Sequence, residues 1–280
     1  MAREPAPGAA SPGHRRAGMM ARLDAYERLI RLDKPIGTLL MRSAGCAFND
    51  WADRRFDPHV ERTASRPLAT GEIGPNEALV VAAVLAFCAF LFVLTTNRTT
   101  ILLSLPAIVV ACVYPFSKRF LSLPQALLGV AFSFGIPMAY AAIHNHVPPL
   151  AWWMLLINLF WVVAYDTEYA MVDRNDDLKL GLRTSAIAFG RFDVVAVMTC
   201  YAVYLAGMAW VGVDRSMGPA YFAGLAAAGL IAGWHWLMIR ERTREGCFRA
   251  FLHNHWLGLA VFAGTALDFA LRFNAWPRPG

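Results

Sequence analysis

The sequence has few charged residues for its length. Asp, Glu, Lys and Arg make up 16% of its 280 residues, 57% are hydrophobic, and the mean hydropathy is +0.42. Because about 25% of residues are charged in an ordinary soluble domain, this composition excludes that class. The five cysteines are scattered, with no C-x-x-C pair and no histidine at metal-ligand spacing. We therefore expect neither a structural disulfide nor a zinc site.

Long apolar runs occupy most of the chain. A helix needs about 20 mostly apolar residues to cross a hydrocarbon core of about 30 Å. Seven runs come near that length: residues 78–96, 101–116, 126–143, 150–164, 194–213, 220–239 and 257–271. Without the alternation of barrel strands, such runs must span as helices. The sequence predicts an all-α, polytopic transmembrane bundle with about seven full spans.

The N-terminal region departs from this pattern. Residues 1–20 are rich in Ala, Pro, Gly and Arg and indicate a disordered tail, and residues 21–34 suit a short helix at the membrane surface. Residues 21–280 are expected to form a single transmembrane domain. Only residues 35–48 separate the surface helix from the next polar stretch, and a helix of that length reaches about 21 Å. They predict an interfacial or re-entrant helix, or the remnant of a hairpin missing between Leu40 and Met41.

Basic residues are distributed unevenly over the links between the apolar runs. Three links hold several each, and the three links that alternate with them hold at most one. The positive-inside rule places the basic links on the cytoplasmic side. We expect an integral protein of a bacterial inner membrane, or of the mitochondrial inner membrane in a eukaryote. The basic links contain Lys118, Arg119; Arg174, Lys179, Arg183, Arg191; and Arg240, Arg242, Arg244, Arg249.

A first acidic stretch stands out because the chain has only 20 Asp and Glu residues. Asn49, Asp53 and Asp57 are four residues apart, which places them on one face of a helix, and Asp50 lies within a turn of that face. Pro58 is expected to end this helix just after Asp57, since the residue before proline disfavours the α region.

A second acidic stretch repeats the spacing. Its members step by three, four and four residues along one helical stripe: Asp166, Tyr169, Asp173 and Asp177. Like charges so placed repel by a few tenths of a kcal/mol per pair, which a bound cation would reverse. Mg²⁺ prefers hard oxygen ligands beside phosphate oxygens. We interpret the two stretches as facing halves of a Mg²⁺–diphosphate site, with a lipid tail among the helices.

Each acidic stretch also leads into a loop that carries an Arg-Thr pair. Arg62-Thr63 follows the first stretch, and Arg183-Thr184 follows the second. Such a repeat supports a shared site, in which Lys and Arg from the loops bind the remaining phosphate oxygens.

At these residues the chain resembles the UbiA superfamily of intramembrane prenyltransferases. The Tyr-Asp-Thr-Glu-Tyr-Ala block favours its 4-hydroxybenzoate polyprenyltransferase branch over the homogentisate, naphthoate and haem farnesyl branches. The matching motifs are Arg31-Leu-Asp-Lys-Pro-Ile-Gly37, Asn49-Asp-x-x-Asp-x-x-x-Asp57, Arg66-Pro-Leu-Ala, Tyr114-Pro-Phe-Ser-Lys-Arg119 and Tyr165-Asp-Thr-Glu-Tyr-Ala-Met-Val-Asp-Arg-Asn-Asp-Asp177.

The resemblance implies a nine-helix membrane enzyme of ubiquinone biosynthesis. It implies Mg²⁺-dependent transfer of a polyprenyl group from polyprenyl diphosphate to the ring carbon ortho to the phenol of 4-hydroxybenzoate. Family members carry most of the first span, an external loop and the start of the second span between the pieces that meet here at Leu40 and Met41. The resemblance thus agrees with the missing hairpin, which puts the activity of this shortened chain in question.

The resemblance also assigns site residues. The expected catalytic residues are Asp53, Asp57, Asp173 and Asp177, and with Asn49 they form the metal set. Ordinary loop charge explains Lys118 equally well, and an interfacial anchor is the favoured reading of Lys34. His144 and His146 are expected to be loop residues, and His253 and His255 structural, while Asp176 supports the second motif. The expected substrate-binding residues are Asn49, Asp50, Arg66, Lys118, Arg119, Tyr165, Asp166 and Tyr169.

Two other classes also place acidic residues in membrane proteins. A CDP-alcohol phosphotransferase sets aspartates at the cytoplasmic face, but its D-G-x-x-A-R block is absent from this sequence. A divalent-cation transporter would have an acidic vestibule, although transporters bind ions near the bilayer midplane at broken helices. Turnover of a polyprenyl diphosphate, as opposed to metal flux, distinguishes these classes.

Overall fold

The structure, a computed structural model, describes residues 40–275, and it is helical with no strand among them. The predicted tail, the surface helix, Lys34 and residues 35–39 lie outside the described residues. The first helix that the structure describes is α2 (Leu40–Asp53).

The chain divides into two compact units, and Phe92 is the last residue of the first. The first unit holds α2, the short 3₁₀ helix η1 (Asp57–His59) and most of α3 (Pro75–Leu94). α3 begins with Pro75. Proline suits the first helical position because the N–H that it lacks would have no partner within the helix there. Small apolar side chains form the core of this unit: Ala47, Leu68, Ile73, Ala78 and Ala82.

The second unit begins with α4 (Arg98–Ser117), α5 (Pro124–Ser133) and α6 (Gly135–His144). Asn97 caps α4, since its side chain accepts a hydrogen bond from the Thr100 backbone N–H at 3.0 Å. The predicted run at 126–143 lies in one candidate span, 124–144, within which Phe134 separates α5 from α6. Pro137 explains the break, because proline cannot donate to the Ser133 carbonyl four residues earlier and its ring clashes there.

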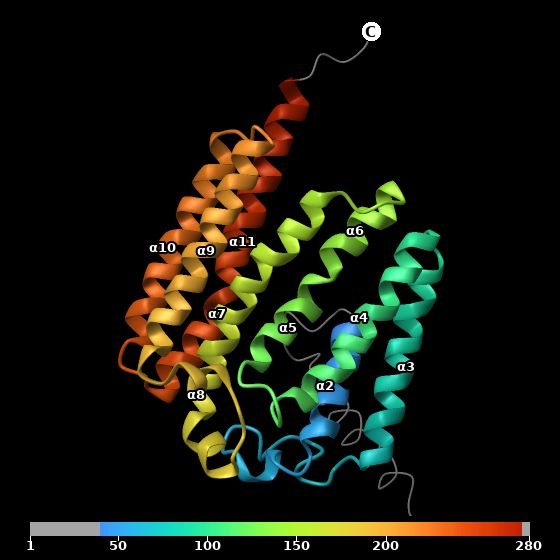
Figure 1. The fold of residues 1–280 in the computed structure, drawn as a ribbon, viewed down its shortest axis with the longest axis vertical. Helices are drawn as coiled ribbons and strands as arrows, with labels where there is room; N and C mark the ends of the chain where they lie inside the picture. The colour runs from blue at the N-terminus through green and yellow to red at the C-terminus, as the bar shows by residue number, and fades with distance from the viewer. Residues whose placement is uncertain (1–39, 276–280) are drawn as a thin grey trace, which may run out of the picture. The chain divides into compact units, whose positions relative to one another are not determined.

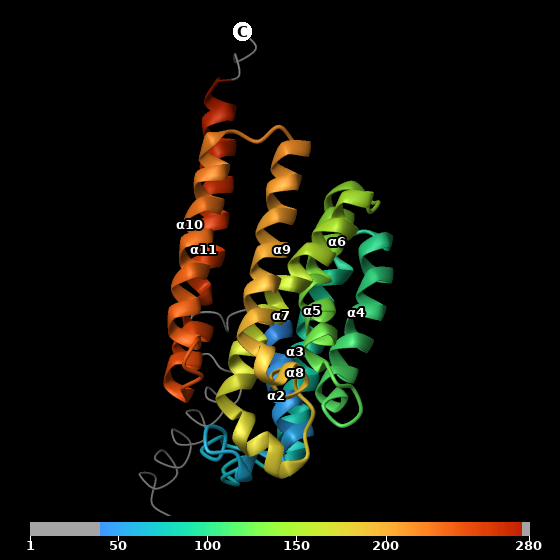
Figure 2. The same cartoon turned by 60° about the vertical axis from the view of Figure 1, so that its left-hand side comes forward.

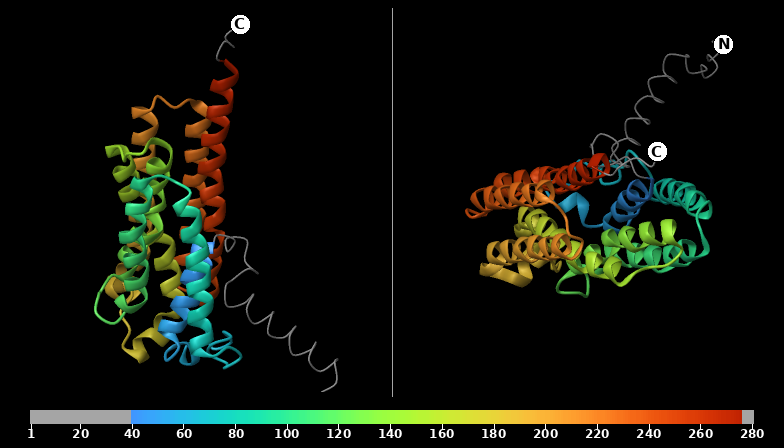
Figure 3. Two further views of the ribbon diagram at one scale, coloured as in Figure 1. Left: turned by 90° about the vertical axis from the view of Figure 1, so that its right-hand side faces the viewer. Right: turned by 90° about the horizontal axis from the view of Figure 1, so that it is seen from above.

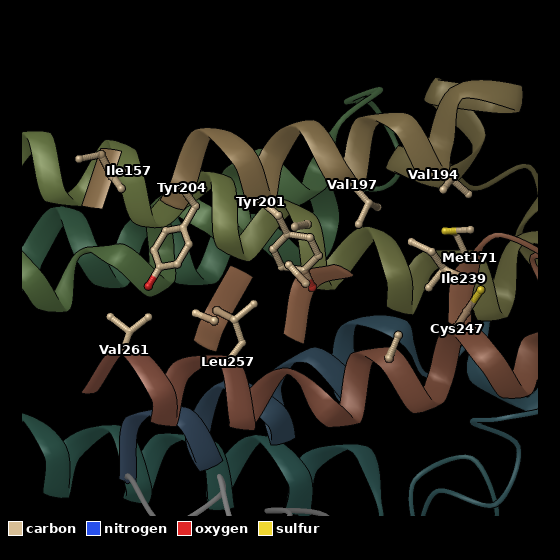
Figure 4. Close-up of a cluster of buried hydrophobic side chains, with 14 of the residues drawn as sticks. Ile157, Met171, Val194, Val197, Tyr201, Tyr204, Ile239, Cys247, Leu257 and Val261 are labelled. Carbon is tan, nitrogen blue, oxygen red and sulfur yellow. The ribbon is translucent and has the colours of Figure 1, made fainter. Parts of the chain in front are cut away.

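The rest of the second unit is a bundle of long helices (Figure 1). The long helices are α7 (Pro149–Leu180), α9 (Asp193–Asp214), α10 (Pro219–Ile239) and α11 (Arg244–Ala275). The short α8 (Ser185–Phe189) and η2 (Gly190–Phe192) lie between α7 and α9 in the chain. α7 packs against α5, α9 and α11. In Figure 4, Tyr201 and Tyr204 project from α9 towards Leu257 and Val261 of α11, within one buried core.

α10 and α11 run side by side over their lengths (Figures 2 and 3). Two glycines allow this approach: a Cβ atom at Gly224 would lie 2.8 Å from the Cα of Gly264 and 2.6 Å from the Ala260 carbonyl oxygen. Lipid gives helices no hydrophobic drive to associate, so small residues that bring backbones together favour packing.

Six helical segments are long and apolar enough to cross a membrane: residues 75–94, 98–117, 124–144, 149–180, 185–214 and 219–239. Their outer faces carry large exposed apolar side chains such as Phe87, Leu230 and Val213. Six of the seven predicted runs lie in these segments, which confirms the all-α membrane class. The seventh run lies in α11, which is 32 residues long and is not among the six, so the count of seven stays a prediction.

Candidate active site

The first acidic stretch lies at the end of α2. Asn49, Asp50 and Asp53 belong to its last two turns, and Asn49 Nδ2 donates to Asp53 Oδ2 at 3.3 Å, as neighbours four residues apart can. Asp50 is fully buried and Asp53 nearly so. Burying carboxylates is costly unless charge or hydrogen bonds compensate, so this helix end is a site that needs positive charge.

The helix was predicted to continue to Asp57, and that prediction is wrong. α2 ends at Asp53, and Asp57 is the first residue of η1. Pro58 has no N–H to donate to the Arg54 carbonyl, so the α-helical hydrogen bonds of α2 cannot continue through η1. Thr63 then fixes the turn, because its hydroxyl donates to the Asp57 carbonyl oxygen at 2.9 Å.

Arg66 joins the two ends of this stretch. Its Nη1 lies 2.9 Å from Asp50 Oδ1 and 2.8 Å from Asp57 Oδ2. Burial raises the pKa of the Asp57 carboxyl, and the Arg66 guanidinium opposes part of that rise. Arg66 was predicted to contact diphosphate; in the structure it bridges two acidic residues of the same cluster.

The second acidic stretch lies near the end of α7, as its spacing predicted. Asp166, Tyr169, Asp173 and Asp177 all belong to this one helix, and the three carboxylates are each 7–8% exposed. Gly181 ends the helix in the left-handed conformation at φ 68°, which glycine adopts without strain. α7 thus continues well past the apolar run at 150–164 and carries the acidic stripe on its last four turns.

Asp176 points to a different partner from the rest of the stripe. Arg244, the first residue of α11, places Nη2 2.9 Å from Asp176 Oδ2, and Lys179 Nζ lies 3.8 Å from Oδ1. The pair ties the start of α11 to α7. Asp176 therefore has a local structural partner, whereas the predicted metal residues were Asp173 and Asp177.

Tyr165 and Tyr169 face α11, where both rings lie close to the ring of Phe251. Tyr169 stacks on Phe251 with ring centroids 4.2 Å apart, and Tyr165 is 6.2 Å from the same ring. Trp161 meets Tyr165 edge-on at 5.8 Å. An aromatic wall thus runs along α7. Phe251 was not predicted from the sequence, because a single Phe in an apolar helix carries no distinguishing signal.

Lys118 and Arg119 immediately follow α4. The Lys118 carbonyl accepts a hydrogen bond from the Arg183 backbone N–H at 3.0 Å, which joins the α4–α5 link to the α7–α8 link. Arg119 lies over the Phe116 ring, 5.1 Å from its centroid. Both predicted phosphate contacts therefore lie beside the loop that follows the second acidic stretch.

The sequence pattern of the UbiA prenyltransferase family matches residues 33–258, most of the chain. The chain belongs to the UbiA prenyltransferase family. Both acidic stretches and the aromatic wall lie within the matched residues.

Curated relatives in the UbiA family are similar over most of their length. The 4-hydroxybenzoate octaprenyltransferase of Cupriavidus necator is 56% identical, over 91% of this chain and 100% of that protein. The 4-hydroxybenzoate octaprenyltransferase of an Azoarcus species is 54% identical, over 89% of this chain and 98% of its own.

The alignment with the Cupriavidus necator protein contains more positions than the number of residues of this chain that are aligned in it. It extends over 285 residues, whereas 91% of 280 residues is about 255. Roughly 30 aligned positions of that relative thus have no residue here.

Solved UbiA homologs share the fold. The apo structure of a UbiA homolog from Aeropyrum pernix K1 superposes with a TM-score of 0.72 at 23% identity, over 93% of this chain and 100% of that one. A UbiA homolog from Archaeoglobus fulgidus, solved bound to GPP and Mg²⁺, gives a TM-score of 0.62 at 17% identity, over 89% and 94%. At these identities the likeness shows the fold alone.

The first cluster of this UbiA protein has a donor atom suited to a metal ion. The side-chain oxygen Oδ1 of Asn49 is buried and has no hydrogen-bond partner among the described residues, while the amide nitrogen faces Asp53. An amide oxygen beside carboxylates is a hard ligand of the kind Mg²⁺ takes. Within residues 40–275, however, no group of three His, Cys, Asp or Glu side chains is already gathered around a metal position. The residues fit the ion in type, and Asn49 has an oxygen left for it.

A buried polar network behind the aromatic wall was missed from the sequence. Glu168 of α7 lies within hydrogen-bond distance of Tyr201 of α9 and Asn254 of α11, and His235 of α10 meets the same tyrosine. His253, expected to be structural, contacts His235 at 3.2 Å. Ionisable residues inside membrane helices are costly and so carry a signal. Glu168 could be recognised from the sequence as such a residue, but its partners could not, because they lie 33 to 86 residues away along the chain.

Proposed function

We propose that the protein transfers a polyprenyl group from polyprenyl diphosphate to the ring carbon ortho to the phenol of 4-hydroxybenzoate, in ubiquinone biosynthesis. The observation that carries the proposal is the presence of two buried carboxylate clusters at helix ends, one with an unsatisfied amide oxygen. The names of the UbiA relatives support the aromatic acceptor, and the 56% identity to one of them supports carrying it over.

The acidic residues divide into two proposed halves of one metal site. Asn49, Asp53 and Asp57 would hold the ion from the first unit, and Asp173 and Asp177 from the second. Bound there, Mg²⁺ would neutralise the departing diphosphate. Asp50 and Asp166 would support the two halves, since both are buried beside these ligands on α2 and α7.

Basic and aromatic residues would complete the site. Arg66 is proposed to exchange one of its carboxylates for a diphosphate oxygen, and Lys118 and Arg119 to bind the remaining oxygens. Tyr165 and Tyr169 would line the place of the aromatic acceptor, because their rings continue the wall formed with Phe251 of α11.

The chemistry follows from charge placement. As the diphosphate leaves, the allylic carbon becomes cationic, and the electron-rich ring ortho to the phenol attacks it. A base then takes the proton from the ring carbon that was attacked, which restores aromaticity. Cationic groups aimed at the leaving oxygens stabilise the charge that develops in this step. The positive-inside bias of the links supports placing this site at the cytoplasmic or matrix face.

The test is a turnover assay of the purified protein in liposomes. With polyprenyl diphosphate, 4-hydroxybenzoate and Mg²⁺, we expect release of diphosphate matched by formation of prenylated 4-hydroxybenzoate. Asp53→Ala and Asp173→Ala should each lower the rate about 100-fold or more, as losses of transition-state charge stabilisation do. Asp214→Ala, at the exposed end of α9, is the matched acidic control and should leave the rate unchanged.

Three results would contradict the proposal. Metal flux without turnover would indicate a transporter, and release of CMP from a CDP-alcohol would indicate a phosphotransferase. Near-normal transfer by Asp53→Ala or Asp173→Ala would remove that residue from the site. Membrane insertion of each variant, followed by protease protection of the links, separates lost chemistry from lost folding.

A further inference from the structure

A shallow cavity lies between two links of the second unit. It has a volume of about 190 Å³ and is lined by Ser122 of the α4–α5 link, by Arg183 and Thr184 of the α7–α8 link, and by Ile187 and Ala188 of α8. None of the residues proposed above for prenyl transfer lines it. The cavity combines one cation, two hydroxyl groups and an apolar side.

The cavity lies where spans end. Its two links join segments that are long and apolar enough to cross a membrane, 98–117 to 124–144 and 149–180 to 185–214. Phe120 and Leu121, in the link that carries Ser122, are 54% and 38% exposed. Polar groups of the cavity thus lie beside exposed apolar side chains, next to the ends of candidate spans.

Arg183 is held in a fixed direction. Its backbone N–H donates to the Lys118 carbonyl at 3.0 Å, and its Nη1 donates to the Phe120 carbonyl at 2.8 Å. Within the described part of the chain, its Nε and Nη2 have no partner. Because guanidinium donors match phosphate oxygens in pairs, these two groups suit a phosphate ligand.

Thr184 supplies a second, independent observation. It is 4% exposed, and its Oγ1 is buried without a hydrogen-bond partner among residues 40–275. It precedes α8 but does not cap it. Thr63, the equivalent residue of the first Arg-Thr loop, donates to the Asp57 carbonyl instead. Leaving a buried hydroxyl without a hydrogen-bond partner is costly, so the Thr184 hydroxyl is available for a ligand.

We propose that this cavity binds the phosphate group of a membrane phospholipid. The guanidinium of Arg183 and the hydroxyls of Thr184 and Ser122 donate to the phosphate oxygens, and the acyl chains lie along Phe120 and Leu121. Basic pockets between membrane helices on the cytoplasmic side bind lipid head groups in this way. Free inorganic phosphate has the same oxygen chemistry but lacks the chains that the apolar surface would cover.

The experiment titrates the purified full-length protein in detergent with three probes and follows bound species by native mass spectrometry. Dioleoyl phosphatidylglycerol has phosphate and chains, dioleoylglycerol has the chains alone, and inorganic phosphate has the anion alone. We expect saturable binding of the phosphatidylglycerol only. Arg183→Gln and Thr184→Val should each weaken it about tenfold, the size of one charged hydrogen bond.

Arg191→Gln is the matched control, since Arg191 lies over the Phe192 ring and does not line the cavity. It removes the same charge from a nearby link and should bind within about twofold of the unaltered protein. Thr184→Val keeps the shape and the net charge, so melting without lipid should not fall. Inorganic phosphate that binds and is lost in Arg183→Gln would support the phosphate site with a free anion as its ligand. Equal binding by all variants, an equal loss in Arg191→Gln, or equal binding of dioleoylglycerol would overturn the proposal.

Discussion

The hydroxyl group of Tyr201 has one proton and three polar neighbours. Glu168 Oε1 and Asn254 Oδ1 both lie at 2.9 Å, and His235 Nδ1 lies at 3.0 Å. The Asn254 orientation is fixed because Oδ1 also accepts from Trp161 Nε1 at 3.0 Å and Nδ2 donates to Glu168 Oε2 at 2.7 Å. The amide oxygen of Asn254 can only accept, so its contact with Tyr201 is a hydrogen bond only if Tyr201 donates its one proton to Asn254. Glu168 must then be the neutral acid that donates to Tyr201.

Glu168→Gln should therefore be tolerated. A glutamine amide donates to the Tyr201 oxygen and accepts from Asn254 Nδ2, so it reproduces the neutral acid. Glu168→Ala removes one buried hydrogen bond from Tyr201 and one from Asn254, which costs about 1–3 kcal/mol for each. We expect Glu168→Gln to melt within a few degrees of the unaltered protein and Glu168→Ala to melt well below it. A large loss in Glu168→Gln would mean that the network needs a carboxylate.

Arg66→Gln tests the charge balance of the first acidic cluster. It removes the cation that lies between Asp50 and Asp57, and breaking a buried ion pair costs on the order of 3 kcal/mol. Because Mg²⁺ can supply the missing charge, we expect the melting temperature of this variant in EDTA to be low and to recover in millimolar Mg²⁺. Arg55→Gln, an exposed neighbour, should show neither effect. Recovery with equal ionic strength of NaCl would indicate screening rather than metal binding.

The residues on which chemistry was predicted differ in how far the sequence could place them. Asp173 and Asp177 were predictable, because helical spacing is a local property of α7. The bridge from Arg66 to Asp50 and Asp57 was not, since it depends on how the chain turns after Pro58. Asn254 could not be predicted either, because its partners come from other helices of the bundle. Whether the two acidic clusters face each other stays a prediction.

At the scale of elements, hydropathy located the helices but not their ends. It marks only the part of a helix that lipid surrounds, so the apolar run at 150–164 covers only part of α7, which continues to Leu180. The polar continuation is the part that carries the acidic stripe. The run at 126–143 was predicted as one span and lies in one candidate span, but its hydropathy did not indicate the interruption at Phe134, for which Pro137 gives a local reason.

The contact between α10 and α11 offers a prediction about helix packing. A Cβ atom added at Gly224 would meet the Gly264 backbone, whereas one added at Gly233 of the same helix would meet nothing within 4 Å. Gly224→Ala should therefore destabilise the bundle by about 1–3 kcal/mol, the cost of overpacking. Gly233→Ala should be neutral or stabilising, since alanine favours helix by up to about 1 kcal/mol. Melting of the two variants in the same detergent checks this, and equal behaviour would rule out close packing at Gly224.

At the scale of the whole molecule, the connection before the first acidic cluster is the feature that needs explanation. Only residues 35–48 lie between the predicted surface helix and the first acidic stretch, too few to cross the bilayer as a helix and return the chain to the other side. About 30 positions of the Cupriavidus necator relative have no residue here. We propose that these positions correspond to a hairpin of the size expected between Leu40 and Met41.

Restoring that hairpin should raise prenyl transfer. The change inserts between Leu40 and Met41 the residues that the Cupriavidus necator protein has at the unmatched positions. A complete pair of spans would anchor α2 at both ends and hold Asn49 and Asp53 in place, and a small misplacement of such groups can cost about 100-fold in rate. We expect turnover in liposomes to rise at least tenfold, while a Gly-Ser insert of equal length gives no gain because it cannot span. If both inserts raised turnover equally, or if neither raised it, α2 would position its ligands without the hairpin.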